Sequence, residues 1–333
     1  MRRRGSYLAV GLVAVASLAG PSALMPLASN GNPDVSGEVV VTLRDEAIGE
    51  SSGLVVRGHR LFTVNDSGDG PYLYEVDLRT GETVGVTSFA DEDPVDVEAL
   101  APGSGEEVWV GDIGDNLRSR GSIRIHRLVP AGGEVRVTAT TYDLAYPDGP
   151  HDAETLLVHP RTERVLVVTK SFGRGGVVHR APQRLEPGRI HRLERVAAVP
   201  GTITDGTFLP GGRQVLLRTY GAAAVYSYPD FEMLQELELP LQEQGEAVAV
   251  GDDGRVYLTS EGALSDVLVL DLPDVEQRAA DVEKRTGPAP TPDEGGDAPG
   301  LGRPPGYALA AVAGAALVAM LVRASRRRGR RRR

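Results

Sequence analysis

Cysteine is absent from this chain of 333 residues, and lysine and tryptophan are nearly absent. Without cysteine there are no disulfides, so a folded domain must be stabilised by its hydrophobic core. The only lysines are Lys170 and Lys284, and the only tryptophan is Trp109, which we expect in the core. The sequence also lacks a P-loop, a dinucleotide fingerprint and a GxSxG turn, so it carries no common signature of nucleotide-binding proteins or serine hydrolases.

Positive charge is scarce between the two ends of the chain. Of the 36 lysines and arginines, 11 arginines lie in residues 2–4 and 323–333, which leaves 25 basic residues against 46 acidic ones. The segment between the ends therefore carries about −21, whereas the whole chain carries −10. This charge argues against nucleic acid as a partner and suits cations or cationic partners.

Both ends have the pattern of membrane targeting. Arginines followed by an apolar run and small residues are typical of a secretory signal, with an uncleaved anchor as the alternative. Near the C-terminus, 17 uncharged residues precede eight arginines, which predicts a single span with a cytoplasmic tail; nucleic-acid binding is the alternative for that tail. The predicted segments are a signal over 1–29, the folded domain over 35–275, a Pro/Gly/acid-rich stalk over 284–305, a transmembrane helix over 306–322 and a basic tail over 323–333.

A two-strand pattern recurs five times within the predicted domain. Each copy has a polar start, a short apolar strand, a turn and a second strand rich in valine and leucine, and the copies begin at Glu50, Asp96, Asp152, Thr204 and Gln244. Repeats of this length indicate stacked supersecondary units. Because the unit is all-β, the pattern predicts a β-propeller.

The number of strands predicts five blades and a closed ring. A second pair of β-patterned runs follows each of the first four hairpins, while the fifth is followed by one run, residues 267–272. The segment from Glu38 to Leu43 supplies the missing strand and would remove an exposed sheet edge. Twenty strands in five blades fit the length, whereas six blades would need a repeat that is not found.

Polar residues are expected to gather at one mouth of the central channel. In an antiparallel hairpin the start of the first strand and the end of the second lie at the same end. Candidate catalytic residues there are Glu98, Glu154, Glu246 and Lys170, and candidate ligand-binding residues are Asp96, Asp152, Asp205, Arg218 and Tyr220. For Lys170, a salt bridge to Glu154 or Asp152 is the alternative to a role in binding an anion.

Two loops rich in Asp, Asn and Gly are candidates for cation binding. The metal candidates are Asp66, Asp112, Asp115 and Asn116, and their oxygen ligands favour Ca²⁺. The alternative is that these residues form ordinary turns and link the blades. No histidine pair has HxH or HExxH spacing, which argues against zinc; His151, directly before Asp152, is the one histidine that we single out.

Several phrases resemble a group of exported bacterial β-propeller proteins near the esterase-like phytase and SdiA-regulated propeller families. They are SSGL, NDSGDGPYLYEVDLRTG, DVEAL, GDIGDN, DAETL and TDGTF, within residues 48–262. The resemblance implies a propeller outside the cytoplasm. Propeller phytases bind calcium and hydrolyse phosphate esters with lysines and arginines around the phosphate, and this chain has few such cations at the predicted mouth.

The sequence thus predicts a membrane-anchored, extracytoplasmic propeller that binds an unknown ligand or protein at the cell surface. The alternative is a calcium-assisted hydrolase of phosphate esters, carboxyl esters or sugars at the central channel. The residues leave open whether the protein is an enzyme.

Overall fold

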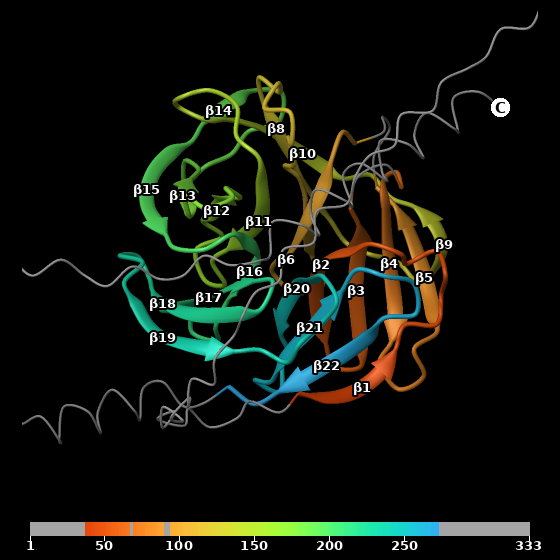
Figure 1. The fold of residues 1–333 in the computed structure, drawn as a ribbon. Helices are drawn as coiled ribbons and strands as arrows, with labels where there is room; N and C mark the ends of the chain where they lie inside the picture. Colours follow the sequence, from red (N-terminus) through yellow and green to blue (C-terminus); the bar gives the residue numbers. More distant parts are fainter. Residues whose placement is uncertain (1–36, 67–68, 90–93, 273–333) are drawn as a thin grey trace, which may run out of the picture. The chain divides into compact units, whose positions relative to one another are not determined.

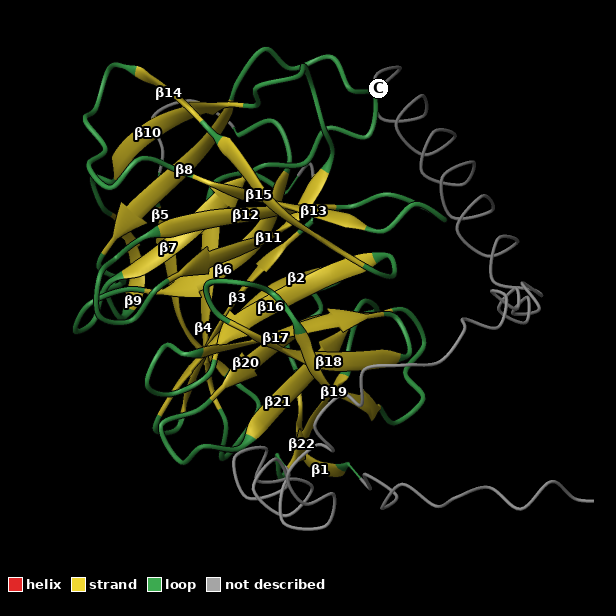
Figure 2. Cartoon of the chain, turned by 90° about the vertical axis from the view of Figure 1, so that its left-hand side faces the viewer, coloured by secondary structure: helices red, strands yellow, loops and turns green. Residues whose placement is uncertain are grey.

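The computed structural model describes residues 37–272, apart from 67–68 and 90–93. Within these residues the chain forms 22 strands and no helix, as Figure 2 shows. The strands form five sheets around a common centre, which confirms the predicted five-bladed β-propeller. The predicted signal, stalk, membrane helix and tail lie outside the described residues. No helix in the described part of the chain has the length and apolarity that a membrane span requires.

The innermost strand of each blade is the first strand of a recurring hairpin. These strands are β2 (Ser51–Arg57), β6 (Val97–Pro102), β11 (Ala153–Val158), β16 (Ile203–Phe208) and β20 (Gly245–Val250). Each contacts the next around the ring, and β20 contacts β2. In Figure 1 they lie near the middle of the view, with outer strands such as β15 and β19 around them.

The remaining strands extend each blade outward. Blade 1 continues with β3 (Arg60–Asn65), β4 (Tyr72–Asp77) and β5 (Thr83–Ser88). Blade 2 continues with β7 (Val108–Asp112), β8 (Ile123–Leu128) and β10 (Thr140–Ala145). Blade 3 continues with β12 (Val165–Thr169), β13 (Gly176–Arg180) and β15 (Glu194–Val199). Blade 4 continues with β17 (Gln214–Thr219), β18 (Ala222–Ser227) and β19 (Met233–Glu238), and blade 5 with β21 (Val256–Ser260) and β22 (Asp266–Leu270).

Two short strands correct the predicted count of twenty. The runs 134–144 and 191–199 are each divided between two strands that belong to different blades. β9 (Gly133–Arg136) pairs in parallel with β5 of blade 1, and β14 (Ile190–Arg192) pairs in parallel with β10 of blade 2. Each short strand covers the outer edge of the preceding blade, and so satisfies backbone groups that would otherwise lie unpaired.

The first described strand lies beside the last one. β1 (Glu38–Thr42) pairs antiparallel with β22, with Val39 opposite Leu268 and Thr42 opposite Asp266. The Thr42 hydroxyl also donates a hydrogen bond of 2.6 Å to Asp266. The outer position of blade 5 is therefore occupied by a segment from the opposite end of the domain.

The core consists of five clusters, one between each pair of neighbouring blades. Successive side chains of a strand point to opposite faces of its sheet, and in this fold both faces are covered by other blades. In β7, for example, Val108 and Val110 pack toward blade 1, whereas Trp109 packs toward blade 3. This double burial explains why the inner hairpins are continuous apolar runs rather than alternating ones.

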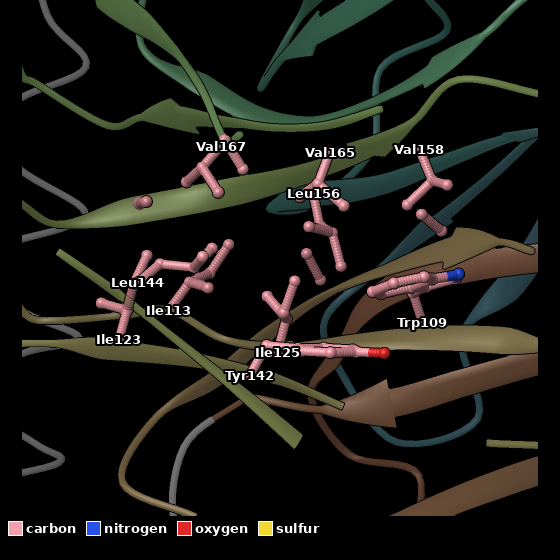
Figure 3. Packing of buried hydrophobic residues seen from close by; sticks show 14 of the residues in the cluster. Trp109, Ile113, Ile123, Ile125, Tyr142, Leu144, Leu156, Val158, Val165 and Val167 are labelled. Atoms are coloured by element: carbon pink, nitrogen blue, oxygen red, sulfur yellow. The ribbon is translucent and has the colours of Figure 1, made fainter. Parts of the chain in front are cut away.

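Trp109 lies in the core, as predicted. It is 3% exposed, and its ring stacks on Tyr142 with centroids 5.8 Å apart. Figure 3 shows both rings beside Ile125, with Val158 and Val165 on the facing blade.

Candidate functional site

Each of the five inner strands begins with a β-bulge. In β2, Ser51 pairs with Asn65 and Gly53 pairs with Val64, which leaves Ser52 without a residue opposite. The same register shift occurs at the start of β6, β11, β16 and β20. A bulge re-aims the side chain of the extra residue. The residues in these shifts include one buried polar residue from each blade, namely Ser52, Glu98, Glu154, Thr204 and Glu246.

The two hydroxyl residues in this set link neighbouring blades. Ser52 Oγ donates to the backbone carbonyl of Glu98 at 2.7 Å, and Thr204 Oγ1 donates to the backbone carbonyl of Glu246 at 3.0 Å. Serine and threonine at the bulges therefore connect one blade to the next. The other three positions are glutamates.

These glutamates belong to a larger group of carboxyls that we call the acidic cluster. It comprises Asp66, Asp96, Glu98, Asp152, Glu154 and Glu246. One carboxylate oxygen from each of Asp66, Asp96 and Glu98 lies within 4.8 Å of the other two. All the predicted catalytic glutamates and two of the predicted ligand-binding aspartates are thus brought together, as antiparallel hairpins require.

Burial and mutual repulsion perturb the acidic cluster. Burial, together with Asp66, Glu154 and Asp96, raises the pKa of Glu98 well above its ordinary value. Burial and repulsion from neighbouring carboxyls also raise the pKa of Glu154, although Lys170 opposes this shift. Burial also raises the pKa of Asp152. Carboxyls in this environment retain protons or attract cations.

Lys170 contributes a positive charge to the acidic cluster. It follows β12, and its Nζ lies 2.9 Å from Glu154 Oε1 in a pair whose side chains are 10% and 5% exposed. Burial alone would lower the pKa of Lys170, but Glu154, Glu246 and the other acids outweigh burial and raise it, so the amine stays charged. Nζ also lies 5.4 Å from the centre of the Tyr220 ring. The salt bridge to Glu154, which was the alternative to anion binding by Lys170, is therefore present.

Gly114 permits the loop after β7 to approach the acidic cluster. A Cβ atom at this position would lie 2.6 Å from Asp96 Oδ2 and 2.7 Å from Glu98 Oε1, closer than real Cβ contacts. This glycine was not among the predicted site residues, although it stands inside the GDIGDN phrase. Its position between two aspartates was the sequence feature that could have indicated a close approach of the backbone to the acidic cluster.

Of the four predicted metal ligands, only Asp66 belongs to the close group of three carboxylates. The Asp112 carboxylate accepts bonds from the N–H groups of residues 95 and 96 and pairs with Arg120 and Arg124. The Asp115 carboxylate accepts from the N–H groups of residues 119 and 120. Asn116 is exposed. These contacts match the alternative in which the loop forms a turn, and metal binding by Asp112, Asp115 and Asn116 stays a prediction.

Asp205 and Arg218 join blade 4 to blade 5. Asp205 Oδ2 accepts a bond of 2.8 Å from the N–H of Val248, and burial raises the pKa of Asp205 well above its ordinary value. The Arg218 guanidinium is fully buried and donates to the carbonyls of Ala247 and Thr259. Burial lowers its pKa to about 10. The structure thus places both side chains in contacts between blades, and their role in ligand binding stays a prediction.

No family model and no curated protein matches this chain. Among solved structures, one described as a crystal structure of glucose dehydrogenase matches with a TM-score of 0.43 and 10% sequence identity. The match covers 72% of this chain and 100% of that chain. The function must therefore be inferred from the side chains themselves.

Proposed function

We propose that this chain is a membrane-anchored, extracytoplasmic β-propeller that binds a ligand at the acidic cluster. One observation carries the proposal: three glutamates at the bulges of three inner strands converge on a single lysine. Burial and mutual repulsion raise the pKa of Glu98 and Glu154, so a positive charge or a hydrogen-bond donor beside these carboxyls would stabilise them. The favoured ligand is therefore cationic, or rich in hydrogen-bond donors.

Calcium is the simplest cation that fits this chemistry. Hard cations prefer oxygen ligands, and carboxylates are their main protein donors. Asp66, Asp96 and Glu98 offer three such oxygens, one from each residue, within 4.8 Å of one another. Binding would relieve the repulsion that raises the pKa of Glu98.

Added calcium is expected to raise the melting temperature of the purified protein above its value in chelator. A ligand that binds only the folded state stabilises it by about 2.7 kcal/mol at roughly a hundredfold excess over Kd. Asp96→Ala removes one ligand and Gly114→Ala fills the approach to two of them, so both variants should lose the response. Asp230→Asn, on an exposed turn, should keep it. Equal melting temperatures with calcium and chelator would contradict calcium binding.

The same experiment has an expected pH dependence. Glu98, Glu154 and Asp152 have raised pKa values in the folded state, so the folded protein binds more protons than the unfolded chain above the unfolded pKa. Stability in chelator should therefore fall as the pH rises through the folded pKa values of these carboxyls. Calcium competes with protons for the same carboxylates, so its stabilising effect should grow as pH rises.

Protease added to intact cells is expected to release a fragment of the size of the propeller domain. The expectation follows from the charge pattern around residues 306–322 and from the composition of 284–305. The fragment can be detected by an antibody against the propeller, with a cytoplasmic protein as the control for lysis. Cleavage only after lysis would reverse the proposed orientation.

A hydrolase is the second candidate function. The raised pKa values of Glu98 and Glu154 beside a charged lysine are the property that general acids and bases require. Hydrolysis of aryl phosphates, acetates or glycosides that Glu98→Gln or Glu154→Gln abolishes would favour this candidate. Binding without turnover would favour the ligand-binding proposal.

A further inference from the structure

A second group of potential metal ligands consists of Asp148, His151 and His179. Asp148 and His151 lie in the loop between β10 and β11, and His179 lies in β13. One ligand atom from each residue lies within 4.8 Å of the other two. His151 Nε2 is 2.8 Å from Asp148 Oδ1, so two of the three side chains are already in contact.

His179 provides an independent indication of a ligand. It is 1% exposed, and among the described residues neither of its ring nitrogens has a partner at standard hydrogen-bond geometry. A buried polar group without a partner costs free energy, and nearly all such groups in native proteins are satisfied. A bound metal ion would use one of these nitrogens.

The Tyr146 ring packs against both imidazoles. Tyr146 meets His151 edge-on with centroids 5.0 Å apart, and it meets His179 edge-on at 4.9 Å. The two imidazole centroids are 5.6 Å apart. The ligands from the loop and from the sheet are therefore positioned together by packing rather than by sequence spacing.

We propose that Asp148, His151 and His179 bind a divalent transition-metal ion, with Zn²⁺ the best match. Two imidazole nitrogens and one carboxylate oxygen are a common zinc donor set, with a water molecule in the remaining position. Zinc ligands lie about 2.0–2.2 Å from the ion, so they are about 3.4 Å apart in a tetrahedral site. Asp148 and His151 have exposed side-chain fractions of 56% and 27% and can move to close the site around the buried His179.

Metal binding would replace the hydrogen bond between His151 and Asp148. Without an ion, one proton lies between His151 Nε2 and Asp148 Oδ1. The ion takes the place of that proton, and both atoms become ligands. A neutral His151 then carries its proton on Nδ1, whereas a protonated His151 keeps the Nδ1 proton and releases the other to solvent. The loop that leads from blade 2 to blade 3 is then attached to β13 of blade 3. This site does not depend on the ligand proposed for the acidic cluster.

Cobalt provides a direct test, because tetrahedral Co²⁺ absorbs visible light and is displaced by Zn²⁺. The full chain, treated with chelator and then titrated with Co²⁺, should bind one equivalent at this site with a tetrahedral spectrum. His151→Ala and Asp148→Asn should each weaken binding by at least about tenfold, because loss of an outer-shell partner alone already costs about 10–100-fold in metal affinity. These two residues are partly exposed, so their replacement leaves the core intact.

Two control variants separate this site from other parts of the molecule. His59→Ala removes an exposed histidine of blade 1 and should leave Co²⁺ binding unchanged. Asp96→Asn alters the acidic cluster and should also leave the Co²⁺ spectrum unchanged. The proposal is overturned if wild-type protein gives no tetrahedral spectrum, or if His151→Ala and Asp148→Asn bind Co²⁺ as wild type does.

Discussion

Deletion of residues 35–44 is expected to make the propeller domain aggregate. We propose that β1 closes the ring by pairing with β22, and the deletion removes that strand. The edge of β22 would then present unpaired backbone groups beside Val267, Leu268 and Val269, which are buried in the intact domain. An exposed apolar strand edge is a template for association with other chains.

The deletion also removes Leu43, which is fully buried, so its effect needs a matched variant. Loss of a buried leucine alone typically costs about 2–5 kcal/mol. A shorter deletion of residues 35–41 keeps Leu43 but removes most of the pairing with β22. Leu43→Ala keeps the pairing but removes the buried side chain. Size-exclusion chromatography and light scattering should show aggregation for the shorter deletion and a monomer for Leu43→Ala. A soluble, monomeric short deletion with an unchanged melting temperature would refute closure by β1.

Replacement of Lys170 by methionine is expected to destabilise the domain by about 3–5 kcal/mol, the usual cost of removing one partner of a buried ion pair. The Glu154 carboxylate would lose the amine 2.9 Å away while its acidic neighbours remain. The free energy of unfolding from urea titrations measures this loss. Because the remaining carboxyl can take up a proton, stability of the variant should recover as the pH is lowered.

A double variant distinguishes a lost ion pair from a general packing defect. Lys170→Met combined with Glu154→Gln removes both charges and should recover much of the lost stability. Arg189→Met is the control, because Arg189 and Glu186 form an ion pair with side chains 71% and 60% exposed. Exposed pairs contribute about 0–1 kcal/mol. If the double variant were as unstable as Lys170→Met, the charge of Glu154 would not be the cause.

The inner hairpins could be predicted because their physical constraints are local. Their strands are buried on both faces, so they are short apolar runs bounded by polar residues and turns, and this pattern is visible five times in the sequence. The partners of β9 and β14 could not be predicted, since alternation continues through residues 134–144 and 191–199. Nothing in those runs indicates that half of each pairs with the preceding blade.

The candidate site was predictable to a similar extent. Asp96, Glu98, Asp152, Glu154 and Lys170 stand at hairpin ends, and antiparallel pairing brings such ends together. The sequence does not indicate which carboxylates accept hydrogen bonds from backbone N–H groups. In the structure the Asp112 carboxylate is one of them. The proximity of Asp148 and His179 was also hidden, because tertiary packing rather than a spacing motif produces it.

The exchange of β9 and β14 between blades affects the order in which the domain can assemble during synthesis. The outer strand of blade 1 emerges from the ribosome only after three strands of blade 2, and the outer strand of blade 2 only after three strands of blade 3. Neither blade can reach its final form before much of its successor has been translated. β1, the first strand among the described residues, can pair only after the last described strand, β22, has been made. The propeller is therefore completed only late in synthesis. If translation stalls before residue 266, the nascent chain contains β1 without its partner β22.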